Sequence, residues 1–230
     1  RIDMFTDSWF RNLEQRIPED LRSDHGRVFR KKPEFDEGIN IRSERPFSGF
    51  GNEQIFNALS CSLCRDWSAF ELSTILLHEA EHRNDKLRRE VKELIKEKNF
   101  RPITWLKKAR DCLRTESSNF RTKGAIASNY FVLLVRDGQY ECYVGQTATT
   151  NFLDMSSRQE ARVIQHFCGI RASSHVKNFG HEPLWSLNCF TEKVRHARRI
   201  EAETKYIISL ANLGIRVRGD RQPQDNGDQN

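Results

Sequence analysis

Two tyrosines, an arginine and a histidine stand at spacings that could gather them around one phosphodiester. Tyr130 begins an apolar run typical of a buried strand, and Tyr143 lies in a second run after the turn-forming pair Asp137-Gly138. Because strand side chains alternate, a two-residue turn puts both phenols on one face of the hairpin. Arg162 and His166 are spaced i, i+4 and therefore share one helix face. Together they could supply the base, charge stabiliser and proton carrier that phosphodiester cleavage needs.

The elements that must position these side chains form a small α+β pattern. Residues 130–135 and 140–145 predict a tight hairpin, and 183–190 predicts a third strand. A helix is expected over 193–213 and a short last strand over 215–217. The second half of the chain therefore predicts a small sheet with helices against it.

The first half has a different pattern. Apolar residues recur at helical spacing from Phe56 to Ile95, with a charged opposite face, and a further helix is expected over 105–115. Phe47 and Phe50 are expected to anchor a polar arm on an apolar surface. We therefore divide the chain into an N-terminal arm (1–52), a helical domain that could serve recognition (53–115), a linker (116–128), the α+β domain (129–221) and a disordered tail (222–230).

Composition narrows the class of protein. The chain has 230 residues and a formal net charge of +6, which suits a polyanionic partner such as DNA. No apolar run approaches the roughly 20 residues of a membrane span, so no membrane partner is expected. Six cysteines in a chain of this length do not form a disulfide framework, which favours a reducing, cytoplasmic location.

Several separated motifs occur in an order that resembles the GIY-YIG nuclease superfamily. They are Tyr130-Phe131-Val132, Tyr143-Val144-Gly145, Arg162 with His166, the stretch 169–180, and the helix 201–208 closed by Gly214. The resemblance covers roughly the last hundred residues. Its first tyrosine stands one place off a simple alignment, and the shared face with Tyr143 is the reason for choosing Tyr130 over Phe131.

The resemblance implies a GIY-YIG-like small antiparallel sheet flanked by helices, and a divalent-metal-dependent endonuclease that leaves 5′-phosphate and 3′-hydroxyl ends on DNA. Tyr143 would deprotonate the attacking water, Tyr130 would orient it and Arg162 would stabilise charge on the phosphoryl oxygens. His166 would make ionisation of the phenol less costly, and Glu203 would hold Mg²⁺ (or Mn²⁺) near the leaving oxygen. Restriction, mobile-element and repair roles all remain open, as does a homo-oligomer.

Three further basic side chains follow the helix that carries Arg162. Arg171, His175 and Lys177 lie in and after a serine-rich turn and could grip DNA phosphates. Ordinary surface charge is the competing interpretation. The chain also lacks the asparagine that often follows the glutamate helix of the family, which leaves open a nucleic-acid-binding module whose nuclease site has decayed.

A metal pattern lies in the first half. Cys61, Cys64, His78 and His82 approximate the spacing of a structural zinc site. The same histidines with Glu79 form a literal HExxH, which on a helix suits a zinc metallopeptidase. The third interpretation is a polar helix with two histidines and two buried cysteines, and the sequence leaves all three open.

Overall fold

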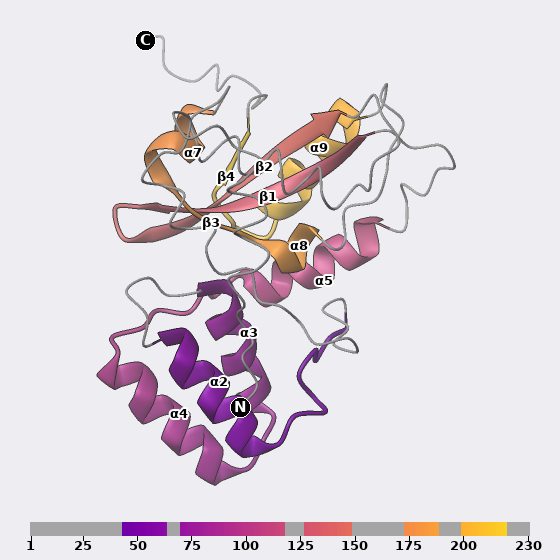
Figure 1. Ribbon diagram of the computed structural model, residues 1–230. Helices are drawn as coiled ribbons and strands as arrows, with labels where there is room; N and C mark the ends of the chain where they lie inside the picture. Colours follow the sequence, from indigo (N-terminus) through magenta and orange to yellow (C-terminus); the bar gives the residue numbers. More distant parts are fainter. Residues whose placement is uncertain (1–42, 64–69, 118–126, 149–172, 189–198, 220–230) are drawn as a thin grey trace, which may run out of the picture. The chain divides into compact units, whose positions relative to one another are not determined.

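The chain contains two compact units. The computed structural model describes residues 43–63, 70–117, 127–148, 173–188 and 199–219 (Figure 1). Of these residues, those up to Lys107 belong to a first unit and those from Lys108 to a second, so the division falls ahead of the expected linker. Most of the N-terminal arm, the centre of that linker and the polar tail lie outside the described residues. Nowhere in the described part is a helix both long and apolar enough to span a bilayer.

The first unit consists of helices, as its apolar periodicity predicts. Helices α2 (Asn52–Leu63), α3 (Phe70–Glu81) and α4 (Asp85–Glu97) contact one another pairwise. Helix α4 begins after Asn84, whose Oδ1 accepts a hydrogen bond from Leu87 N at 3.0 Å. The core of this unit is aliphatic and aromatic, and its deeply buried members include Phe47, Ile55, Leu59, Leu72, Leu76, Leu87, Val91 and Ile103.

Two further sequence predictions are confirmed, one in the first unit and one in a helix that lies mostly in the second. Phe47 is fully buried and meets Phe50 edge-to-face, with ring centroids 5.3 Å apart, so the end of the arm is anchored on the core. The helix expected over 105–115 is present as α5 (Leu106–Ser117). Before it, Ile103 N donates to Thr74 Oγ1 at 3.0 Å, which ties the connection after α4 to α3.

The second unit is built on the predicted hairpin. Strands β1 (Ala127–Arg136) and β2 (Gln139–Ala148) pair antiparallel around Asp137 and Gly138. Both turn residues have positive φ, 50° and 72°, as a type I′ turn requires. The Asp-Gly pair therefore fixes the register of the hairpin, as the sequence predicts.

The sheet is mixed, and the expectation of an antiparallel sheet is wrong for one pairing. Its strand order is β3-β1-β2-β4, where β3 is Gly180–Pro183 and β4 is Val217–Arg218. Strand β3 pairs antiparallel with β1, but β4 pairs parallel with β2. Strand β4 follows helix α9 (Arg199–Ala211), and a connection that crosses a sheet with a helix returns the chain parallel. The coarse α+β class holds.

The third strand predicted over 183–190 is also a misassignment. The pairing ends at Pro183, which has no N–H to give, and Trp185–Asn188 forms the short helix α8. Leu184 N still donates to Phe131 O at 3.0 Å before the chain turns. Leu184 and Leu187 are both fully buried and stand three residues apart, which is the spacing of one helix face. The apolar run therefore forms the buried face of a helical turn.

The two faces of the sheet meet different helices. Tyr206 of α9 contacts Phe131 of β1, with ring centroids 5.9 Å apart, and α9 lies behind β1 and β2 in Figure 1. On the other face by alternation, the Arg136 guanidinium lies 5.0 Å from the ring centroid of Phe179 in α7 (Ser174–Phe179). The odd-numbered side chains of β1 therefore face α9, and the even-numbered ones face α7.

Candidate functional site

The hairpin brings the two predicted tyrosines together. Val132 pairs with Tyr143 and Tyr130 pairs with Gly145, so Tyr130 and Tyr143 point from the same face. Their ring centroids are 6.2 Å apart at an interplanar angle of 41°. Both residues are buried, with 1% and 0% of their surface exposed. The shared face predicted from the Asp-Gly turn is confirmed.

Glu203 approaches the sheet from the side that α9 covers. It is 1% exposed and lies near Gly219, which follows β4: a Cβ built at Gly219 would lie 3.6 Å from Glu203 Oε1 and 2.7 Å from Ile207 Cδ1. The next helical turn carries Tyr206 against Phe131, whose side chain points away from the tyrosine face. The phenol pair and α9 therefore belong to opposite faces, and Glu203 reaches the sheet where β4 ends.

The structure describes some of the remaining predicted nuclease residues and not others. Arg162, His166 and Arg171 lie outside the described residues. His175 and Lys177 lie on α7, half-buried and exposed respectively. Since Phe179 of this helix contacts Arg136, α7 packs on the tyrosine face. Both basic side chains therefore come from an element that packs on the same face of the sheet as the phenol pair.

A buried carboxylate on the tyrosine face was missed by sequence reasoning. Glu141 stands two residues before Tyr143 on β2 and is 2% exposed. Its Oε2 accepts a hydrogen bond from Arg218 Nε at 3.0 Å, and Arg218 pairs with Tyr143 across the parallel β2–β4 ladder. Alternation along β2 could have placed Glu141 beside Tyr143. Its arginine partner is 77 residues away and belongs to β4, which pairs parallel with β2.

The predicted zinc ligands are described only in part. Cys61 is exposed on α2, His78 is half-buried on α3 and His82 is exposed just beyond the end of α3, while Cys64 lies outside the described residues. Among the residues that the structure describes, no group of three or more His, Cys, Asp or Glu side chains is placed to hold a metal ion.

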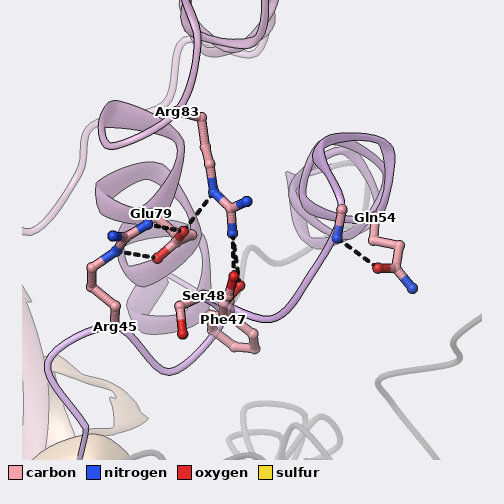
Figure 2. Close-up of polar contacts among 7 residues, drawn as sticks. Arg45, Phe47, Ser48, Gln54, Glu79 and Arg83 are labelled. Atoms are coloured by element: carbon pink, nitrogen blue, oxygen red, sulfur yellow. Dashed lines mark hydrogen bonds and ion pairs between the residues drawn. The ribbon is translucent and has the colours of Figure 1, made fainter.

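The glutamate of the HExxH pattern is held by two arginines (Figure 2). Glu79 accepts hydrogen bonds from Arg45 Nη2 at 2.8 Å and Nε at 3.1 Å, and from Arg83 Nε at 2.7 Å. Arg83 Nη2 also donates to the carbonyls of Phe47 and Ser48, at 3.1 and 2.9 Å. The cluster links the turn before α2 to α3, so Glu79 has a structural role in this unit.

The charge state of Glu79 follows from these contacts. Burial raises the pKa of its carboxyl, but the hydrogen bonds and charges of Arg45 and Arg83 lower it more, and the pKa ends below the ordinary value of 4.5. A carboxylate held ionised by two guanidinium groups is a poor proton acceptor. The metallopeptidase interpretation gains no support from this geometry.

We compared the chain with known protein families, curated proteins and solved structures. No family model, no curated protein and no solved structure matches the chain.

Proposed function

We propose that the chain is an endonuclease of GIY-YIG type, which hydrolyses DNA phosphodiesters to 5′-phosphate and 3′-hydroxyl ends. The observation that carries this proposal is the pairing of Tyr130 and Tyr143, whose rings lie 6.2 Å apart on one face of a register-locked hairpin. A base beside a second phenol that can orient it is the arrangement that the resemblance leads one to expect. Helix α7 adds the basic residues His175 and Lys177 on the same side.

The proposed roles follow from position and chemistry. Tyr143 takes the proton of the attacking water, and Tyr130 orients Tyr143 or that water. Hydrogen-bond donors near the phosphoryl oxygens stabilise the charge that develops there, a task that the resemblance assigns to Arg162. His166 lowers the cost of ionising the phenol by the same analogy.

A magnesium ion is part of the proposal, and Glu203 is the residue that fits it. A carboxylate is the oxygen ligand that Mg²⁺ accepts, and one carboxylate suffices for an ion that keeps several waters. Residue 219 is a glycine, so no side chain of that residue lies against Glu203 Oε1, which is 3.6 Å from where its Cβ would be. When bound, the ion would neutralise the leaving 3′ oxygen.

Cleavage of supercoiled plasmid in Mg²⁺ tests the proposal through a matched pair of variants. Tyr143→Phe removes the phenolic hydroxyl and is expected to lower the rate by roughly 100-fold or more, the contribution of a general base. Tyr140→Phe makes the same change three residues earlier on β2, on the face toward α9, and should cleave as the unaltered protein does. Equal rates for the two variants, or no cleavage by the unaltered protein, would reject the proposal.

A second candidate is a nucleic-acid-binding module without cleavage. The position of Glu203 favours it, because α9 approaches the sheet from the face opposite the phenol pair. Such a module would bind DNA with steep salt dependence and leave plasmid uncut in Mg²⁺. The same plasmid assay therefore separates the two candidates.

A further inference from the structure

A charged group lies on the tyrosine face at the edge of the sheet. Glu141 is flanked by two arginines: Arg218 Nε lies 3.0 Å from Oε2, and Arg216 Nη1 lies 3.9 Å from Oε1. The side chains are 3%, 30% and 68% exposed for Glu141, Arg218 and Arg216. Two positive charges against one negative charge leave the group net positive.

The contact with Glu141 fixes Arg218 but leaves most of its donors available. The guanidinium has five N–H groups, and only the one on Nε meets the carboxylate. Within the described ranges, neither terminal nitrogen of Arg218 has a hydrogen-bond partner. A guanidinium fixed at one nitrogen loses little conformational entropy when its remaining donors bind a second anion.

The position of Arg218 relates this group to the phenol pair. Arg218 and Tyr143 are register partners in the parallel ladder, so their side chains leave neighbouring strands from the same face. Adjacent strands are about 4.8 Å apart. A phosphate held by Arg218 would therefore lie beside Tyr143.

We propose that Arg218, held by Glu141, binds a backbone phosphate of DNA next to Tyr143. Arg216, the more exposed of the two, supplies a second phosphate contact. The choice of DNA as the phosphate source rests on the proposed function. The planar guanidinium group matches the geometry of phosphate oxygens. The Arg218 side chain is 30% exposed, whereas an ion pair that only stabilised the fold would not need to be accessible to solvent.

DNA binding measured in EDTA tests this site without cleavage. A fluorescein-labelled 20-base-pair duplex is titrated by anisotropy across a series of salt concentrations. The main variant is the double substitution Glu141→Gln with Arg218→Gln, which exchanges the ion pair for an amide pair and leaves no buried charge unpaired. We expect about tenfold weaker binding and a salt slope smaller by about one unit, the signature of one lost phosphate contact.

Two further variants sharpen the comparison. Arg218→Lys keeps the charge but loses the fork, so it should keep the salt slope while binding a few-fold more weakly. Arg114→Gln removes an arginine of similar exposure, 39%, that pairs with Asp111 on α5, and should bind DNA as the unaltered protein does.

The outcomes separate this inference from the proposed function. A folded double variant, checked by circular dichroism, that binds with unchanged affinity and slope would overturn it, as would an unaltered protein that does not bind the duplex. Arg218-dependent binding without plasmid cleavage supports the phosphate site and rejects the endonuclease. Cleavage and binding that are both indifferent to Arg218 support the endonuclease and reject the site.

Discussion

The ring of Tyr130 occupies the space in which residue 145 would carry a side chain. A Cβ built on Gly145 would lie 2.2 Å from Tyr130 Cζ and 2.4 Å from its hydroxyl oxygen. Since the two residues are register partners, the glycine is what allows the phenol to lie across β2. The last residue of the Tyr-Val-Gly motif thus has a steric function that concerns the tyrosine of the neighbouring strand.

Gly145→Ala should therefore both destabilise the second unit and disturb the phenol pair. The new methyl group must displace a buried ring, and overpacking of this kind costs about 1–3 kcal/mol. Urea unfolding followed by circular dichroism measures the loss, and plasmid cleavage should fall with it. Gly49→Ala is the control, because no atom lies within 4 Å of a Cβ at Gly49. Equal stability of the two variants would contradict this account of Gly145.

The arginine pair around Glu79 predicts a loss of stability in acid. The pKa of Glu79 is lower in the folded chain than its ordinary value of 4.5, so the unfolded chain binds the proton more tightly. The stabilisation is complete above pH 4.5 and is lost as the pH falls through the lower folded pKa. Glu79→Gln leaves two arginines without their carboxylate and should cost about 1–3 kcal/mol at pH 7.

Urea unfolding at several pH values checks this prediction. The stability difference between the unaltered protein and Glu79→Gln should narrow as the pH falls below 4.5. Glu81→Gln, an exposed position at the end of the same helix, serves as the control and should show no such trend. A difference that stays constant down to pH 3 would mean that the ion pairs do not supply the stability.

Two free cysteines should differ sharply in reactivity. Cys142 is fully buried in β2, and burial raises the pKa of its thiol, whereas Cys61 is exposed on α2. A thiol reagent at pH 8 should modify Cys61 within minutes and Cys142 only after unfolding, as peptide mapping by mass spectrometry would show. Addition of urea should remove the difference. Equal labelling of both thiols in the native protein would contradict the burial of this strand.

Metal dependence gives a further prediction for the proposed endonuclease. EDTA should abolish plasmid cleavage, and Mg²⁺ or Mn²⁺ should restore it. Glu203→Gln keeps the size of this buried side chain and should raise the Mg²⁺ concentration for half-maximal rate as well as lower the rate. Glu201→Gln, on the exposed side of the same helix, is the matched control. Identical Mg²⁺ titrations for the two variants would contradict a role for Glu203 in binding the metal.

The parts of the fold that local sequence determines were predictable, and the parts that depend on distant contacts were not. Asp137-Gly138 fixes its own turn geometry, so the register and the facing tyrosines followed from a few residues. The run after Pro183 has apolar residues that suit a strand or a helical turn equally, and the surrounding packing decides for the helix. Neither prediction depends on the resemblance to a known family.

The charged pairs show the same limit. Arg45 and Glu79 are 34 residues apart and Glu141 and Arg218 are 77 apart, so nothing local in the sequence relates them. Glu79 illustrates this limit. Its HExxH sequence context suggests a metallopeptidase site, but in the structure its carboxylate binds Arg45 and Arg83, which link the turn before α2 to α3. Motif patterns identify residue types, and tertiary contacts decide how those residues are used.

The parallel pairing of β4 with β2 gives this face an order of assembly. The hairpin can close as soon as residue 148 has left the ribosome, since the pairing of β1 with β2 is local in the sequence. A nascent chain therefore carries the Glu141 carboxylate without its guanidinium partner until Arg218 in β4 has been synthesised. The edge that carries Glu141 and Arg218 is thus the last portion of the described sheet to form, and a polypeptide stalled before β4 would present the phenols without it.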